Sequence, residues 1–249
     1  MPKDARLIIN SMGKADLHIH TNFSDGITKP SDVLKLAKSR GLAVIAITDH
    51  NTIEGAQEVK KYEKESGVEV IIGEEVSTIA GHIAGLFLQK VIPRGFDPAD
   101  TIKAIHSQGG IAVITHPLAQ FPKSVNLAAL DYLVNHNDPN CRPDAVEVLN
   151  GFPWNFRRSS QLLSMNNEWK LAITGGSDSH GPRSLGCAYT LFEGNSSIDL
   201  RKALAHKTTA VHGHTMPMVE WIRTVGNDAL YRSRKMFNSQ STRSSSSPH

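Results

Sequence analysis

Short hydrophobic runs alternate along the chain with longer segments in which hydrophobic residues recur every three to four positions. The runs predict strands and the periodic segments predict helices. The expected strands are residues 16–20, 42–48, 68–74, 82–88, 111–115, 145–149 and 171–174, and the expected helices are 30–40, 52–66, 97–108, 127–135 and 155–167. Strands and helices that alternate at this spacing predict an α/β fold with a mostly parallel sheet, either a barrel or a doubly wound sheet.

The composition predicts a globular protein without a membrane span. The chain has 249 residues, of which 39% are hydrophobic, an ordinary fraction for such a protein. Its longest apolar run, residues 41–47, is far shorter than the ~20 residues of a membrane helix, and residues 1–14 contain no apolar stretch of signal-peptide length. Only two cysteines occur, Cys141 and Cys187, so we expect a reducing, cytoplasmic location.

The excess of basic residues lies at the C-terminal end of the chain. From residue 216 onward there are five basic and two acidic residues, whereas the preceding part has 22 of each and does not predict a nucleic-acid groove. Residues 217–237 predict a short basic amphipathic helix, which we interpret as packed on the domain surface in preference to binding a membrane surface or a partner. Residues 239–249 are polar and of low complexity and are predicted to be disordered. We therefore expect a main domain over 1–215, a basic extension over 216–238 and a serine-rich tail.

Histidine and acidic residues stand at the ends of the expected strands. They occur at 18–20, 49–50, 74–75, 82, 116 and 178–180, and in a parallel α/β barrel the carboxyl ends of the strands open at one mouth. Each alone also has a structural interpretation, such as a helix cap for Asp49 or a turn residue for Asp25. Together, clustered imidazoles and carboxylates repel one another or lose solvation unless a cation lies between them. Because no thiolate lies at ligand spacing, we predict a catalytic site for Zn, Mn or Fe instead of a structural Cys-rich zinc site.

Seven segments carry a resemblance to a known family. They are ADLHIHTNFSDG (15–26), AITDHNTIEG (46–55), IIGEE (71–75), GHIAGLFL (81–88), ITHP (114–117), EVLNG (147–151) and GGSDSHGPRSLG (175–186). In this order they resemble the motifs of the PHP family, named for polymerase and histidinol phosphatase. The resemblance spans about residues 15–215 and implies a distorted (β/α)7 TIM-like barrel with up to three metal ions at its mouth.

The same resemblance implies nine metal-ligating residues in three groups. The first group is His18, His20, Glu75 and Asp178; the second is Asp25, His50 and His180; the third is Glu75, as a bridge, with His82 and His116. None of the nine is missing, which argues against a non-catalytic relative. Some relatives have histidine where this chain has Asp25, so the chain resembles the nucleotide-phosphatase branch. Glu74 is the alternative to Glu75, but the spacing in the family favours Glu75.

The charge of such a site predicts an anionic substrate. Three divalent cations beside three carboxylates leave an excess of about three positive charges, which attracts phosphate esters. A hydroxide that bridges two metals can then attack the phosphorus in line. Besides Asp178 and His180, we predict Arg183 as a catalytic residue, because it can offer a bidentate fork to the phosphate.

The expected function is that of a metal-dependent phosphoric ester hydrolase acting on a small phosphate monoester, a nucleotide or an amino-alcohol phosphate. A nuclease-like phosphodiesterase, a C–N hydrolase on the same barrel and a non-hydrolytic metal sensor are the alternatives. Arg157 and Arg158 are alternative phosphate ligands to Arg183, and Asp49 is a candidate to orient an imidazole. The aromatic residues Phe121, Phe152 and Trp154 either stack on a base or cover apolar surface.

Overall fold

The computed structural model describes residues 12–119, 123–153, 158–219 and 222. Most of the predicted C-terminal helix, the whole serine-rich tail, and the residues Phe121, Trp154 and Arg157 lie outside the described residues. The boundaries of the C-terminal extension therefore stay a prediction. Among the described residues, no helix combines the length and the apolar character that crossing a membrane requires.

Nine strands among the described residues form one sheet in the order β7-β6-β5-β4-β3-β2-β1-β8-β9. The strands are β1 (Gly13–Ile19), β2 (Val44–Ile47), β3 (Glu69–Thr78), β4 (Gly81–Leu86), β5 (Ile111–Ile114), β6 (Ala145–Asn150), β7 (Ala172–Gly176), β8 (Ala188–Phe192) and β9 (Ala210–Gly213). The seven predicted strands are all present, and β8 and β9 are additional. The resulting nearly closed, barrel-shaped sheet is the distorted TIM-like barrel that the sequence predicted.

The sheet is less parallel than we predicted. Strands β1, β2 and β3 pair in parallel, as do β5, β6 and β7, but β4 is antiparallel to both of its neighbours and β8 is antiparallel to β1 and β9. Only Ile79 and Ala80 separate β3 from β4, and such a short connection permits a hairpin but no crossover helix.

The barrel closes between its first and last parallel strands. The segment after β7 pairs with the end of β1 through a bridge between Ile19 and Ser179, in which the Ser179 carbonyl accepts from His20 N at 2.9 Å. At the opposite end, β8 fills the gap, since Thr190 Oγ1 accepts from Gly175 N and donates to the Gly175 carbonyl. The closure brings residues 18–20 beside residues 177–180.

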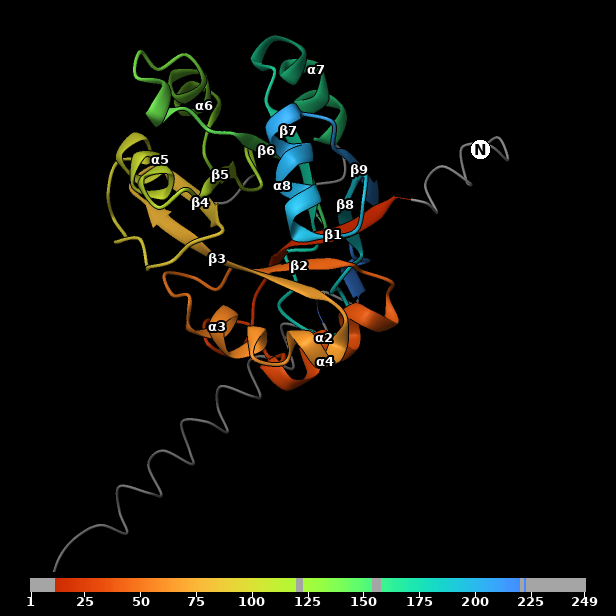
Figure 1. The fold of residues 1–249 in the computed structure, drawn as a ribbon. Coiled ribbons are helices and arrows are strands. Elements are labelled where there is room, and N and C mark those ends of the chain that lie inside the picture. Colours follow the sequence, from red (N-terminus) through yellow and green to blue (C-terminus); the bar gives the residue numbers. More distant parts are fainter. Residues whose placement is uncertain (1–11, 120–122, 154–157, 220–221, 223–249) are drawn as a thin grey trace, which may run out of the picture.

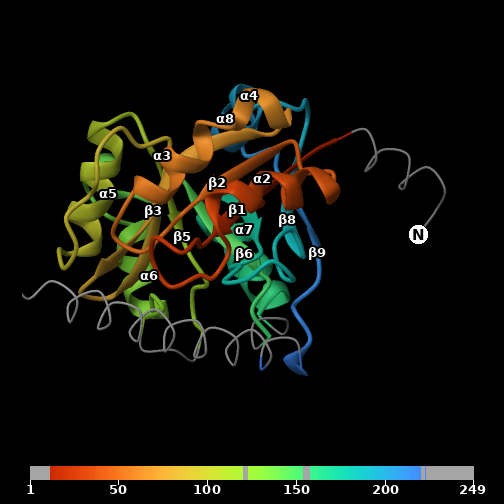
Figure 2. The same cartoon turned by 90° about the horizontal axis from the view of Figure 1, so that it is seen from below.

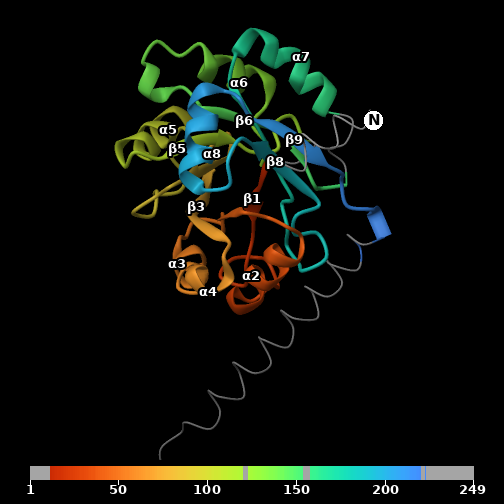
Figure 3. The ribbon, with the colours of Figure 1, turned by 45° about the vertical axis from the view of Figure 1, so that its right-hand side comes forward.

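Helices surround the strands on the outside (Figures 1 and 3). They are α2 (Pro30–Ser39), α3 (Glu54–Lys60), α4 (Glu63–Ser66), α5 (Pro98–Ser107), α6 (Leu127–Val134), α7 (Ser159–Trp169) and α8 (Ser197–His206). Helices α2, α3 and α4 cover one side of the sheet, the side from which Figure 2 views the molecule. The predicted helix 52–66 is split into α3 and α4, and Gly67, with a φ of 73°, ends the second part. Helix α8, which we did not predict, begins with a capping box formed by Ser196 and Asp199.

The inward faces of the strands change from apolar to polar toward the mouth. Side chains two residues apart on a strand point to the same face. Along that face, Ala145 of β6 is followed by Glu147, and Val113 of β5 by Thr115 at the strand end, while Ala84 of β4 is preceded by His82. The apolar members belong to one buried cluster, so a packed hydrophobic layer closes the barrel beneath the polar mouth.

Candidate metal centre

The nine predicted ligands converge at this mouth, although their positions in the chain span residues 18–180. They surround or adjoin a cavity of about 320 Å³ whose lining includes His50, Glu75, His82, His116 and Asp178. The histidine and carboxylate ligand atoms there form four overlapping sets, and within each set the atoms lie within 4.8 Å of one another. The convergence follows from strand ends that meet at one end of a barrel.

The first group forms a compact set of four ligand atoms. The Nε2 atoms of His18 and His20 are 3.1 Å apart. Glu75 Oε2 lies 3.5 Å from the first and 3.3 Å from the second, and Asp178 Oδ1 lies 3.5 Å and 3.4 Å from the same two nitrogens. All four residues are buried.

These distances fit a single divalent cation. Metal–ligand bonds of about 2.0–2.1 Å in a tetrahedron place neighbouring ligand atoms about 3.3–3.4 Å apart. Five of the six distances between the four atoms, all except the one between the two carboxylate oxygens, range from 3.1 to 3.5 Å. Two imidazoles and two carboxylates are also a donor set that suits zinc and related transition metals.

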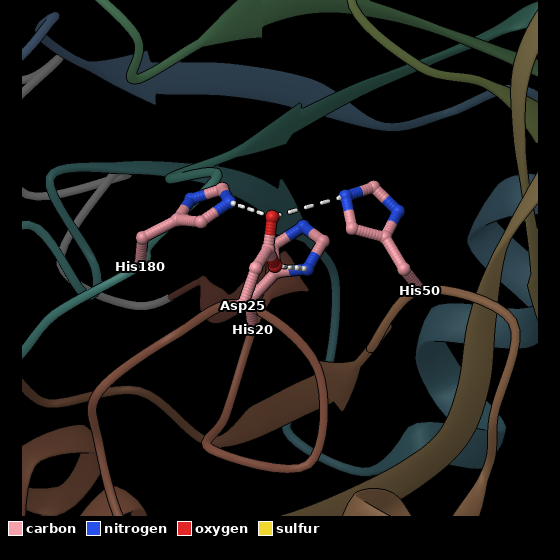
Figure 4. A group of neighbouring side chains, drawn as sticks. All are labelled: His20, Asp25, His50 and His180. Atoms are coloured by element: carbon pink, nitrogen blue, oxygen red, sulfur yellow. Dashed lines mark ion pairs between the residues drawn. The ribbon is translucent and has the colours of Figure 1, made fainter. Parts of the chain in front are cut away.

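The second group is centred on one carboxylate oxygen (Figure 4). Asp25 Oδ2 lies 3.4 Å from His50 Nε2 and 3.2 Å from His180 Nε2, while Asp25 Oδ1 lies 3.3 Å from Nδ1 of His20. In Figure 4 the rings of His50 and His180 approach this oxygen from opposite sides. His20 therefore connects the first group with the second.

The third group is formed around the other oxygen of Glu75. Glu75 Oε1 lies 3.1 Å from His82 Nδ1 and 2.9 Å from His116 Nε2, and it accepts a hydrogen bond from Thr115 Oγ1 at 3.0 Å. The second oxygen, Oε2, faces the first group and lies 3.2 Å from His50 Nδ1. Glu75 thus directs one oxygen to each of two ligand groups, whereas its neighbour Glu74 accepts from Ile92 N.

The electrostatics of the cluster match a site built for positive charge. Burial opposes ionisation of Asp178, but the charges of His18 and its other histidine neighbours hold the pKa of this carboxyl below its ordinary value. Burial likewise opposes the charge on His18, yet Asp178, Glu147 and Glu75 raise its pKa well above the ordinary value. Shared protons compensate the carboxylates in this arrangement, and a divalent cation replaces such protons with a stronger, fixed charge.

Asp49 organises the loop that carries Asp25. Its carboxylate accepts hydrogen bonds from Thr21 N and Thr21 Oγ1, each at 2.7 Å, and from Ser24 Oγ at 2.6 Å. The sequence makes Asp49 a candidate to orient an imidazole, but these three contacts are to the loop. Gly55 leaves room for the carboxylate, because a Cβ there would lie 2.0 Å from Asp49 Oδ2.

Two of the predicted ligands have left-handed backbone conformations. The φ angle is 30° at His116 and 50° at Asp178. Residues with a side chain rarely adopt this region, and such strain is concentrated at functional sites. Each of the two is the second residue after a strand, β5 or β7, so the turn directs its side chain back into the mouth.

Sequence reasoning missed Glu147, a buried carboxylate on β6 that contacts the cluster. Its Oε1 lies 3.1 Å from His18 Nδ1, and its Oε2 accepts from His116 N at 2.7 Å. Asn150 Nδ2 donates to the same Oε2 at 2.8 Å and to Asp178 Oδ2 at 3.3 Å. The signal was present in the sequence AVEVLN, where a single glutamate occupies an inward position of an otherwise apolar strand.

The cationic residue that lines the cavity is not the one we predicted. Arg183 is exposed, on the loop after His180, and is not part of the cavity lining. Among the described residues that line the cavity, Lys123 is the only lysine or arginine, and its carbonyl accepts from His82 N at 2.9 Å. Phe152 also lines the cavity. The role of Arg183 stays a prediction, and Lys123 is a second candidate to bind an anion.

The sequence also matches described families and relatives. The PHP domain matches residues 16–180, and a PHP-associated region matches residues 162–209.

An uncharacterised protein of Methanocaldococcus jannaschii is 44% identical over 150 residues, covering 56% of this chain and 82% of that protein. A 5'-3' exoribonuclease of Haemophilus influenzae is 35% identical over 40% of this chain and 38% of its own length. A 3',5'-nucleoside bisphosphate phosphatase of Chromobacterium violaceum is 36% identical over 36% of this chain and 30% of its own length. The chain thus spans well under half the length of these two enzymes.

Solved structures show the same fold. A two-domain protein of Bacteroides vulgatus, described as containing a predicted PHP-like metal-dependent phosphoesterase, superposes with a TM-score of 0.68 at 22% identity, covering 82% of this chain and 65% of that one. At this identity the likeness concerns the fold, while the family match extends over most of the described residues. The chain therefore belongs to the PHP domain family.

Proposed function

We propose that the chain hydrolyses a small phosphate monoester, a nucleotide or an amino-alcohol phosphate, at a site that holds up to three ions of zinc, manganese or iron. The observation that carries this proposal is the close approach of ligand atoms of His18, His20, Glu75 and Asp178, with two further ligand groups sharing His20 and Glu75. Divalent cations held there supply Lewis acidity toward the phosphate oxygens and lower the pKa of a bound water. The relatives named above, a bisphosphate phosphatase and an exoribonuclease, support phosphate-ester chemistry.

The chain's own residues supply the geometry and the proton handling. Glu75 joins the first and third groups through its two oxygens, which fixes their separation. His180 and Asp178 face the cavity, where they can hold metal and exchange protons with the leaving group. Lys123 at the cavity lining and Arg183 on the neighbouring loop are the candidates to bind the phosphate oxygens.

The size of the cavity favours a small substrate. Its volume of about 320 Å³ is at the lower end of the range of about 300–1,000 Å³ for small-molecule pockets. A mononucleotide or an amino-alcohol phosphate fits such a volume, whereas a nucleic-acid duplex does not enter it. Phe152 at the wall can pack against a base or another flat group.

The test is a phosphatase screen on protein reconstituted with Zn²⁺, Mn²⁺ or Fe²⁺. Nucleoside mono- and bisphosphates, sugar phosphates and histidinol phosphate are offered, and His50→Ala serves as the inactive control. We expect phosphate release from at least one monoester and its loss in the control. Metal-bound protein that hydrolyses none of them contradicts the proposal.

A phosphodiesterase is the second candidate, and the likeness to an exoribonuclease favours it. A 5'-labelled single-stranded oligoribonucleotide and bis(4-nitrophenyl) phosphate are therefore included in the screen. Cleavage of these diesters at a higher kcat/KM than any monoester replaces the first proposal with the second. No preference of this kind is expected, because the cavity is small.

A further inference from the structure

Glu147 contacts three parts of the metal centre without belonging to any of its ligand groups. We propose that Glu147 is a positioning residue that fixes the tautomer of His18 and holds β1, the turn at His116 and, through Asn150, Asp178 in register. The inference rests on the proposed metal site but on none of the candidate substrates. The residue is 3% exposed, so its oxygens must find all their partners inside the protein.

Glu147 uses its carboxylate oxygens only as hydrogen-bond acceptors. An ionised carboxylate has acceptors and no donor. Glu147 Oε2 accepts from the backbone N–H of His116 at 2.7 Å and from Asn150 Nδ2 at 2.8 Å. Two donors already face Oε2, and His18 Nδ1 faces Oε1 at 3.1 Å. This arrangement is satisfied only when His18 carries its proton on Nδ1.

A proton on Nδ1 determines what the other ring nitrogen can do. The Nε2 atom of His18 then presents a lone pair toward the site it shares with His20, Glu75 and Asp178. Metal-ligating histidines are commonly fixed in this way by a carboxylate on the opposite nitrogen. Glu147 therefore leaves Nε2 as the nitrogen of His18 that binds a cation, once the cation has displaced any proton there.

The packing around this pair leaves no room for an alternative position. A Cβ at Gly176 would lie 2.7 Å from Glu147 Oε1 and 2.4 Å from the Cβ of His18. Gly176 is thus required for β7 to pass close to both side chains. The carboxylate and the imidazole are held by their surroundings as well as by their mutual contact.

The substitution Glu147→Gln tests the proposal because an amide has only one acceptor oxygen. It cannot accept hydrogen bonds both from His18 and from the donors at His116 and Asn150. If the amide oxygen faces His116 N and Asn150, the NH2 group faces His18 Nδ1 and forces the proton onto Nε2. If the oxygen faces His18, the NH2 group meets two other donors. Either orientation disturbs the first ligand group while the volume of the side chain stays the same.

A second carboxylate provides a matched control. Asp144, just before β6, lies 2.8 Å from His106 Nε2 and accepts from Ala112 N at 2.7 Å. It therefore makes the same two kinds of contact, to an imidazole and to a backbone N–H, outside the metal centre. Asp144→Asn should alter stability but not metal binding.

The experiment measures binding of Co²⁺ alone and of Zn²⁺ alone to the metal-free full chain, by titration and by the visible absorption of bound cobalt. We expect Glu147→Gln to weaken the tightest site by about 10- to 100-fold and to change the cobalt spectrum. Asp144→Asn should keep both the affinity and the spectrum of the parent. Parent-like affinity and spectrum in Glu147→Gln, or an equal loss in Asp144→Asn, would overturn the proposal.

A measurement on the parent chain covers the case in which Glu147→Gln fails to fold. Nitrogen-15 NMR of imidazole-labelled, zinc-loaded protein reports which nitrogen of His18 is protonated. We expect a proton on Nδ1 and zinc on Nε2. A proton on Nε2, or zinc on Nδ1, contradicts the proposed role of Glu147.

Discussion

Carboxylate and imidazole groups meet at two places in the barrel, and their surroundings differ. At the mouth, His18, His20, Glu75 and Asp178 are buried, and their ligand atoms crowd together at 3.1–3.5 Å. At the opposite rim, His106 makes one contact of 2.8 Å with Asp144, whose side chain is 42% exposed, and a second with the Asn140 carbonyl at 2.8 Å. At the rim each group has its own hydrogen-bond partner.

The difference shows what distinguishes a metal centre from a structural ion pair. At the rim, one imidazole faces one carboxylate, and both ring nitrogens are satisfied by hydrogen bonds. At the mouth, several imidazoles face the same carboxylate oxygens. Two nitrogens there, His20 Nδ1 and His50 Nδ1, make no hydrogen bond among the described residues, although each lies within 3.3 Å of a carboxylate oxygen. An excess of convergent lone pairs over available protons favours a cation.

The largest expected effect comes from Glu75→Gln. Glu75 contributes to both the first and the third ligand groups, so its loss disturbs more than one metal position. Withdrawal of several kcal/mol of Lewis-acid stabilisation corresponds to a loss of about 10³-fold or more in kcat/KM. Metal content by elemental analysis and phosphatase kinetics check this. Glu74→Gln is the matched neighbour; activity and metal content equal to the parent in Glu75→Gln would contradict the ligand assignment.

Removal of the metal should reverse the pH dependence of stability. In the metal-free chain, the pKa values of His18 and His20 are raised by the carboxylates around them. Their stabilisation is complete below the unfolded value of about 6.5 and is lost as pH rises through the raised folded value, so the free energy of unfolding should fall as pH rises above about 6.5. Metal binding requires deprotonated imidazoles, so loaded protein should become more stable over the same range.

Thermal unfolding with excess Zn²⁺ and with a chelator, at several pH values, measures this reversal. Metal at 1,000 times its Kd adds about 4 kcal/mol to stability, an effect large enough to separate the two curves. If the two curves have the same slope with pH, metal binding does not displace protons from the buried histidines.

A smaller effect on kinetics should distinguish the two residues that are candidates to bind the phosphate, Lys123 and Arg183. We expect Lys123→Gln to raise KM or lower kcat about tenfold, because Lys123 lines the cavity and a charge-assisted hydrogen bond contributes about 1.5 kcal/mol or more. Arg183→Gln tests the original prediction, and kinetics with a monoester substrate compare the two. A loss confined to Arg183→Gln would show that the loop closes over bound substrate.

The smallest effect is expected at the rim. His106→Gln removes the contact with Asp144, and loss of a partly exposed hydrogen bond costs about 1 kcal/mol of stability. Denaturant unfolding measures the change, and metal content should stay that of the parent. A loss of metal in this variant would mean that the two ends of β6 are coupled more tightly than the contacts indicate.

Most of the elements could be recognised in the sequence, and so could most of the histidine and acidic residues that meet at the mouth, for a common physical reason. Hydrophobic runs mark buried strands, and histidine or acidic residues that follow such runs stand out. Examples are AITDH, which ends at His50, and ITH, which ends at His116. The antiparallel direction of β4 was missed, although the two-residue spacing before Gly81 indicates a hairpin. Strands β8 and β9 were missed, and both pair antiparallel at the β1 edge of the sheet.

The parts that escaped prediction depend on contacts between distant segments. Glu147 is an isolated acidic residue in the sequence, and only the closure of the barrel brings its side chain to His18 of β1. Similarly, nothing in the sequence around Lys123 distinguishes it from a solvated surface lysine. Its position at the cavity follows from the pairing of its carbonyl with His82 N.

The bridge between Ile19 and Ser179 has a consequence for biosynthesis. The first histidines leave the ribosome long before Asp178 and His180, so the emerging polypeptide lacks the residues that complete the first and second groups of ligands. Domains fold as units when enough chain has been made. If the proposed first and second groups bind cations, we therefore expect them to do so only after nearly the whole barrel has been translated.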